Sequence, residues 1–130
     1  DKISSYLKDV TGVNSLYYRF PGGSSNEISN VNMAEFVRVL NEKGITYFDW
    51  NVSAGDTSSD YTVDDVVTNV TEGVKRYKGS VVLLHDGDDK STTVEALEPL
   101  IQKLQQMKAE ILPIDENTKV IQYIKADSVE

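Results

Sequence analysis

The sequence predicts an α/β protein in which helices alternate with the strands of a parallel sheet. Apolar residues recur at helical spacing in four segments, and short apolar or aromatic runs lie between these segments, separated by glycine and polar residues. One run, SVVLLH at 80–85, is continuously apolar up to its histidine, which is typical of a strand covered on both faces. Because successive parallel strands need a crossover, the alternation indicates right-handed βαβ units.

The four predicted helices have apolar stripes at 3–10, 33–40, 63–77 and 97–107. Gly12 ends the first helix, Asn32 caps the second, and Thr62 opens the third. In the fourth segment Pro99 is best tolerated in a first turn, so the regular helix is expected to begin near Glu98.

The predicted strands are SLYYRF (15–20), ITYFDW (45–50), SVVLLH (80–85) and EILPI (110–114). The last part of the chain, 115–130, is open to two interpretations, because VIQYI at 120–124 fits a strand or one helical turn. The sequence contains no internal repeat, low-complexity tract or linker. We therefore expect residues 1–130 to form one domain or a contiguous part of one.

Composition limits the classes of partner. The 130 residues include 21 acidic and 13 basic side chains, for a net charge of −8, which argues against nucleic acid or an anionic membrane as a partner. No apolar run is long enough for a transmembrane segment. The absence of cysteine excludes disulfides, thiolate metal sites and a cysteine nucleophile.

Polar side chains follow three of the predicted strands, where sites form in parallel α/β proteins. They are Arg19 after the first strand, Asp49 and Trp50 at the end of the second, and His85 at the end of the third. Taken singly, each has an ordinary structural role: a surface ion pair, a turn cap, a packed ring or a hydrogen-bonded histidine. Their shared position at strand ends predicts one common rim.

Several sharper motifs are absent. PGGSSN at 21–26 is not a nucleotide-binding P-loop, although its backbone N–H groups could bind a phosphate, which stays a weaker alternative. DGDDKS departs from a calcium loop at Ser91 and Leu97, where glycine and glutamate are needed. No nucleophile elbow surrounds Ser24 or Ser25. A single histidine excludes a zinc site built on several histidines of this chain.

Three segments in this order, RFPGGSSN, YFDWNVSAGD and VVLLHDG, resemble the polysaccharide deacetylases of the NodB homology type, carbohydrate esterase family 4. The similarity is to the Gram-positive peptidoglycan or chitooligosaccharide deacetylase branch. It implies alternating βα units of a distorted (β/α)7-type barrel, of which residues 1–130 would be roughly the C-terminal half of a single domain.

The resemblance implies roles for individual residues. Arg19 and Pro21 match an R-x-P motif, whose arginine orients the catalytic base and whose turn, continued by Gly22, shapes the oxyanion and substrate site. Leu83 and His85 match an L-x-H motif, in which the leucine shapes the acetyl pocket and the histidine is the general acid.

Asp49 and Trp50 match the end of a D-x-x-D-W motif, with Thr46 in place of its first aspartate. The resemblance implies that Asp49 tunes the catalytic histidine and that Trp50 forms a wall of the sugar groove. Amide hydrolysis forms a tetrahedral oxyanion and expels a poor amine leaving group, so a protonated imidazole suits the final step. An aspartate beside His85 would favour its charged form.

The implied function is hydrolysis of N-acetyl groups on N-acetylglucosamine residues of peptidoglycan or chitin-like glycans, outside the cell or at a bacterial cell wall. A zinc-type divalent metal is expected for the complete domain. The family's T-F-D-D-G and H-x-x-x-H motifs, which supply the base and metal ligands, are missing from this sequence. The chain alone is therefore expected to hold no metal tightly and to be inactive, and its expected partners are a glycan and the missing N-terminal half or a second copy. The alternative is a non-catalytic carbohydrate-binding or structural remnant.

Overall fold

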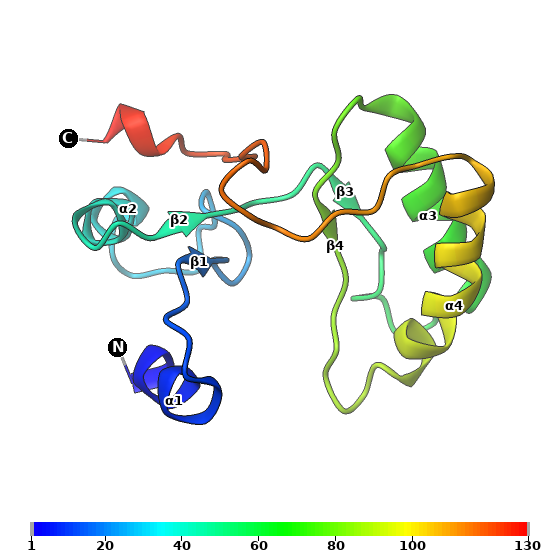
Figure 1. Cartoon of the computed structure of the whole chain (residues 1–130), viewed down its shortest axis with the longest axis horizontal. Helices are drawn as coiled ribbons and strands as arrows, with labels where there is room; N and C mark the ends of the chain where they lie inside the picture. The colour runs from blue at the N-terminus through cyan, green and yellow to red at the C-terminus, as the bar shows by residue number, and fades with distance from the viewer. Residues whose placement is uncertain (1, 130) are drawn as a thin grey trace. The chain divides into compact units, whose positions relative to one another are not determined.

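The computed structural model describes residues 2–129 and confirms a mixed α/β protein (Figure 1). In chain order its elements are α1 Lys2–Thr11, β1 Tyr17–Tyr18, α2 Met33–Glu42, β2 Thr46–Tyr47, β3 Val52–Ser53, α3 Val63–Arg76, β4 Val82–Leu83, α4 Ser91–Gln106 and the 3-10 helix η1 Ala126–Ser128. No helix within residues 2–129 is both long and apolar enough to cross a membrane.

The first three helices lie where the apolar stripes predict them. Asn32 caps α2 by accepting a hydrogen bond from the Ala34 N–H at 3.0 Å. Thr62 opens α3 with a reciprocal capping box, in which its side chain and that of Asp65 each accept from the other residue's backbone N–H. Local side-chain chemistry therefore sets where these two helices begin.

The predicted start of the fourth helix is wrong. α4 begins at Ser91, and Pro99 lies inside it rather than in its first turn. The buried stripe of this helix includes Thr93 and Ala96, which precede the proline. Packing of this earlier part of the stripe outweighs the hydrogen bond that Pro99 cannot donate.

The strands are parallel but much shorter than predicted, and they form two separate two-stranded sheets, β1–β2 and β3–β4. The segment 110–114, predicted as a strand, has no regular structure, and β3 lies just beyond the predicted 45–50 strand. Residues 120–124 form neither of the two predicted elements. Their backbone instead bonds to side chains and main chain of the β2 region, including Asp49 N–H to Ile121 O at 2.7 Å.

The chain forms two compact units, Asp1–Asp49 with Val120–Glu130, and Trp50–Lys119. In the first unit a small core forms from Phe20, Met33, Val37 and Tyr47. The rings of Phe20 and Tyr47 meet edge to face with their centroids 5.2 Å apart. This core fixes α2 beside β2 and the turn that follows β1.

In the second unit α3 and α4 lie side by side (Figure 1), and their inner faces form the core with β3. The buried residues are Val52, Ala54, Val66, Val70, Ala96 and Leu100. Gly73 of α3 faces Val52 so closely that an added Cβ would lie 2.5 Å from a Val52 methyl carbon. The close approach of helix and strand therefore requires glycine at this position, and the packed core gives the ends of β3 and β4 a rigid support.

Candidate active site

Two parallel strands of the Trp50–Lys119 unit end at the same edge and bring Asp56 and His85 together. Ser53 of β3 pairs with Leu83 of β4, and the Ala54 N–H donates to the Leu83 carbonyl at 3.0 Å. Asp56 and His85 follow these paired residues within a few positions. They lie beyond the carboxyl ends of the strands, where parallel α/β proteins place their sites.

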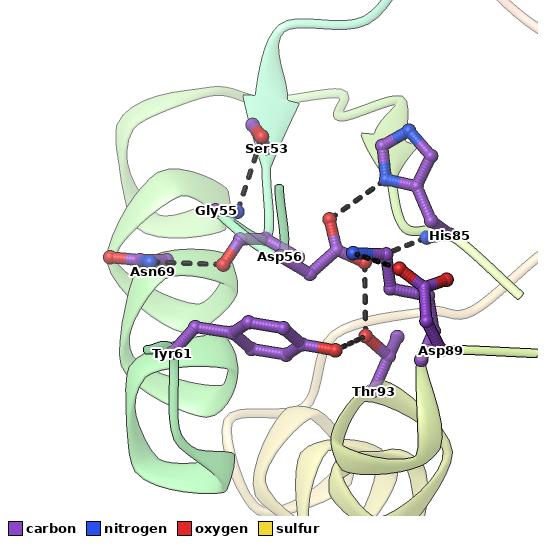
Figure 2. Close-up of polar contacts among 10 residues, drawn as sticks. Ser53, Gly55, Asp56, Tyr61, Asn69, His85, Asp89 and Thr93 are labelled. Atoms are coloured by element: carbon purple, nitrogen blue, oxygen red, sulfur yellow. Dashed lines mark hydrogen bonds and ion pairs between the residues drawn. The ribbon is translucent and has the colours of Figure 1, made fainter. Parts of the chain in front are cut away.

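The Asp56 carboxylate accepts three hydrogen bonds from two residues (Figure 2). The main-chain N–H of His85 donates to Oδ2 at 2.7 Å, and the ring Nδ1 of His85 lies 2.9 Å from Oδ1. The Thr93 hydroxyl donates to Oδ2 at 3.1 Å. Asp56 is fully buried, whereas the His85 side chain is 29% exposed. The carboxylate is thus an internal anchor for a ring that reaches solvent.

The hydrogen bonds keep Asp56 ionised. Burial alone would raise its pKa, but the bonds from the His85 side chain, the His85 backbone and Thr93 outweigh burial and lower the pKa below its usual 3.8. An ionised carboxylate only accepts, so Nδ1 of His85 carries a proton whether the ring is neutral or charged. Proton gain and loss therefore occur at Nε2, which makes the ring suited to acid–base chemistry.

The loop that carries Asp56 is fixed by its own contacts. The Gly55 N–H donates to Ser53 Oγ at 3.2 Å, and Asn69 of α3 donates from Nδ2 to the Ala54 carbonyl at 2.9 Å. Gly55 has a φ of +77°, and an added Cβ would lie 2.7 Å from Asn69 Nδ2. Glycine is therefore needed here for both its conformation and its size.

The RFPGGSSN segment of the other unit forms a tight turn after β1. The Gly23 N–H donates to the Phe20 carbonyl at 2.9 Å, and Gly22 has a φ of +73°, which with Pro21 before it is typical of a type II turn. Asn26 donates from Nδ2 to the carbonyls of Pro21 and Gly23, at 3.1 and 2.8 Å. The turn therefore has a fixed shape.

Asp49 has a different environment from the one expected. Its buried carboxylate accepts from the Ser24 N–H and the Tyr123 N–H, each at 2.7 Å, and from the Ser24 hydroxyl. Ser24 Oγ in turn accepts from the Ile124 N–H at 2.9 Å. From the sequence, Asp49 was expected to be the carboxylate beside His85. Instead, three donors of its own unit surround it, and His85 pairs with Asp56.

The other residues predicted for the site are divided between the two units. Leu83 lies half-buried in β4 and Trp50 lies half-buried before β3, so both belong to the unit that holds His85. Arg19, Pro21 and Gly22 are exposed residues after β1 in the unit that holds Asp49. The structure thus places Leu83 and His85 at one sheet edge, and Trp50 lies in the same unit. The other predicted site residues lie in the unit of Asp49.

Sequence reasoning missed Asp56, Thr93, Tyr61 and Ser24. A signal for Asp56 was present, because in the segment VSAGD at 52–56 an aspartate follows a short strand that neighbours the histidine's strand. The hydroxyl groups gave no comparable signal, since serine and threonine are common in loops and first helical turns.

The described side chains show no arrangement suited to a divalent metal. Within residues 2–129 no group of three or more histidine, aspartate or glutamate side chains is arranged to hold one. Aspartate and histidine meet at the candidate active site as a hydrogen-bonded pair, not as a ligand set.

The chain is similar to solved deacetylase structures. The catalytic domain of peptidoglycan N-acetylglucosamine deacetylase from Eubacterium rectale matches 95% of this chain at 35% identity, with a TM-score of 0.88. A CE4 esterase from Streptococcus mutans matches 82% of the chain at 26% identity and a TM-score of 0.66. A polysaccharide deacetylase from Bacillus cereus shares the fold over 93% of the chain, at 18% identity and a TM-score of 0.67.

The chain spans about half the length of these solved structures, covering 57%, 48% and 58% of them respectively. Neither a protein-family model nor a curated protein sequence matches it. The three motifs and the two solved structures above 25% identity nevertheless agree. They confirm that this chain resembles the polysaccharide deacetylases of carbohydrate esterase family 4.

Proposed function

We propose that this chain is the C-terminal part of a metal-dependent deacetylase that removes N-acetyl groups from N-acetylglucosamine residues of peptidoglycan or chitin-like glycans. The observation that carries the proposal is the Asp56–His85 pair at the ends of β3 and β4. Its imidazole is anchored through Nδ1 and partly exposed, in a chain 35% identical to a peptidoglycan N-acetylglucosamine deacetylase.

His85 is the proposed general acid. Expulsion of the sugar amine from a tetrahedral intermediate requires a proton on its nitrogen. A proton held on Nε2 can be delivered there, while Nδ1 stays bonded to Asp56 throughout. Asp56 thus takes the place beside the histidine that the resemblance assigned to Asp49, and it orients the ring through Nδ1.

The remaining predicted residues have roles in substrate binding or in orienting the base. Arg19 orients the base, and the Pro21–Gly22 turn contributes backbone groups near the developing oxyanion. Trp50 offers an aromatic face to a sugar ring, and Leu83 contacts the acetyl methyl group. In this proposal Asp49 acts indirectly, by holding Ser24 and hence the turn.

The metal and the catalytic base are proposed to come from elsewhere in the complete domain. This sequence contains neither a T-F-D-D-G nor an H-x-x-x-H motif, and its described side chains offer no metal-ligand cluster. A segment N-terminal to this chain that carried both motifs would complete the distorted (β/α)7 barrel. A second copy of the chain, which lacks the same motifs, could cover open strand edges but could not supply the ligands.

A glycan substrate of this kind implies action outside the cell or at the bacterial cell wall. This proposed location rests on the substrate class alone.

The test is acetate release from N-acetylated peptidoglycan and from a chitooligosaccharide. The 130-residue chain alone should release none and should show no submicromolar zinc site by calorimetry. The same chain joined to an N-terminal segment that carries the two motifs should release acetate in a zinc-dependent manner. If the joined protein binds the glycan but is inactive under all metals tried, the chain is a carbohydrate-binding remnant and the catalytic proposal is wrong.

A further inference from the structure

We propose that Tyr61 and Thr93 are positioning residues for His85, acting through the Asp56 carboxylate. The Tyr61 hydroxyl lies 2.8 Å from Thr93 Oγ1, and Thr93 Oγ1 lies 3.1 Å from Asp56 Oδ2 (Figure 2). Asp56 Oδ1 then meets the His85 ring at 2.9 Å. One continuous row of hydrogen bonds therefore runs from the start of α3 to the imidazole.

The chemistry of the groups fixes the direction of this row. A threonine hydroxyl has a single proton, and the ionised Asp56 carboxylate has none to offer. The Thr93 hydroxyl therefore donates its hydrogen bond to Asp56, and the phenol O–H of Tyr61 must donate to Thr93 Oγ1. Asp56 Oδ1 is left to accept the Nδ1 proton of His85. Each donor points toward the carboxylate, which is the arrangement that stabilises a buried negative charge.

The surroundings hold this row rigidly. Thr93 is 3% exposed and lies in the first turn of α4, while Tyr61 precedes the capping residue Thr62 of α3 and packs against the core of its unit. The ammonium of Lys90 lies 5.6 Å from the centre of the Tyr61 ring, in the range of a cation–π contact. The packed ends of two helices thus set the position of the Thr93 hydroxyl.

The hydrogen bond from Thr93 helps to fix the plane of the Asp56 carboxylate. The His85 backbone N–H holds Oδ2 from one side, and Thr93 holds the same oxygen from α4. Two donors on one oxygen restrict rotation about the side chain and keep Oδ1 aimed at the ring. Without the hydroxyl, only the two bonds from His85 itself would orient the carboxylate. The contribution to catalysis rests on the proposed function, whereas the positioning of the ring does not.

The test uses the imidazole of His85, which is the only histidine and so gives a single set of nitrogen signals. In the ¹⁵N-labelled protein, the Nδ1–H tautomer should dominate when the ring is neutral. In Thr93→Val, exchange of the Nδ1 proton with water should be about tenfold faster, as expected for loss of a hydrogen bond to a charged group. Tyr61→Phe should give about a threefold increase.

Two matched variants separate positioning from packing. Thr93→Ser keeps the hydroxyl and should remain near the wild-type rate, and Thr92→Val makes the same change one residue away on α4 and should have no effect. Tyr61→Phe decides the matter even if Thr93→Val does not fold, because it removes only the donor to Thr93. An unchanged Nδ1 signal and exchange rate in Tyr61→Phe would overturn the proposal, as would equal effects of Thr93→Val and Thr93→Ser.

Activity gives a second, separate readout. In the joined deacetylase, Thr93→Val should lower kcat about tenfold with KM unchanged, because the hydroxyl contacts no substrate. If the NMR signature changes as expected but the wild-type joined protein releases no acetate, the proposed function fails and the positioning role stands. If acetate is released and Thr93→Val has the wild-type kcat, the catalytic part of the inference is wrong.

Discussion

The Asp56 carboxylate contacts His85 twice, through the main-chain N–H at 2.7 Å and through ring Nδ1 at 2.9 Å. One side chain therefore fixes both the backbone position of the histidine and the orientation of its ring. Because the carboxylate is fully buried, its charge acts on the imidazole with little screening by water. This contact therefore ties the loop after β4 to the loop after β3 and holds the ring of the one histidine through Nδ1.

Replacing Asp56 by asparagine should destabilise the protein at neutral pH by about 1–3 kcal/mol, since an amide cannot accept from all three donors. The folded pKa of Asp56 is lowered, so its stabilising effect is complete above the unfolded value of 3.8 and is lost as the pH falls through the lower folded value. The difference in unfolding free energy between wild type and Asp56→Asn should therefore narrow in acid.

Urea unfolding at several pH values measures this difference. Asp60→Asn is the matched control, because Asp60 is exposed and bonds only to Ser59 among the contacts described. A wild-type advantage that stayed constant from neutral pH into acid would contradict the role given to the Asp56 charge.

In the joined protein, asparagine variants of Asp56 and Asp49 should affect the kinetic constants differently. His85→Ala should lower kcat by about 10²–10⁴, the range for loss of a general acid. Asp56→Asn should lower kcat substantially, because it removes the carboxylate oxygen that orients Nδ1. Asp49→Asn should act mainly on KM and stability, because Asp49 holds the Ser24 turn. Steady-state kinetics are the measurement, and an equal loss of kcat in Asp49→Asn and Asp56→Asn would contradict the separate roles given to the two carboxylates.

Ser24→Ala should destabilise the unit that contains β1 and β2 by about 2–3 kcal/mol. The buried hydroxyl donates to Asp49 and accepts from the Ile124 N–H, so both partners lose a bond. Hydrogen exchange of the Ile124 amide should accelerate accordingly. Ser25→Ala, at an exposed neighbour, is the control and should change neither quantity; equal effects of the two variants would refute the network.

Tyr47 should ionise only in strong alkali. Burial, followed by the charges of Asp49 and Asp127, raises its pKa to about 12 from the usual 10. A raised folded pKa means that its stabilising effect is complete below pH 10 and is lost as the pH rises through about 12. Tyr47→Phe should lack this alkaline loss and should be about 1 kcal/mol less stable at neutral pH, because the hydroxyl bonds to the Ile124 carbonyl.

The difference in tyrosinate absorbance between wild type and Tyr47→Phe reports the ionisation directly. Tyr6→Phe, at an exposed position of α1, controls for the removal of any phenol. A difference spectrum with a midpoint near pH 10 would contradict the buried environment of Tyr47.

The helices were predictable because their signals are local. The apolar stripe at 63–77 begins next to the capping residue Thr62, so neighbouring residues alone indicate where α3 begins and which face it buries. The start of α4 was predicted wrongly because Pro99 is typical of a first helical turn. In the folded chain, packing of Thr93 and Ala96 against the rest of the unit outweighs this local preference. Strand lengths likewise depend on pairing partners distant in sequence.

The site was predictable only in part. His85 was found because it ends a continuous apolar strand, and the family resemblance was carried by short contiguous motifs. Its carboxylate partner was assigned to Asp49, since that residue lies next to Trp50 in the sequence. The choice between Asp49 and Asp56 depends on which strand pairs with β4, and the Val52–Val82 register that decides it is a property of the folded chain.

The hydrogen bond from Ile124 to Ser24 joins residues one hundred positions apart, and the contiguous Trp50–Lys119 unit lies between them in the chain. During synthesis, Ser24 and Asp49 leave the ribosome long before Tyr123 and Ile124. The turn after β1 therefore cannot acquire its full set of donors until the inserted unit has been made. Local contacts let α3 and α4 associate early, whereas the turn after β1, which is made before them, completes its hydrogen bonds only after them. Until then the Asp49 carboxylate lacks the Tyr123 N–H, so water is the donor that can take its place.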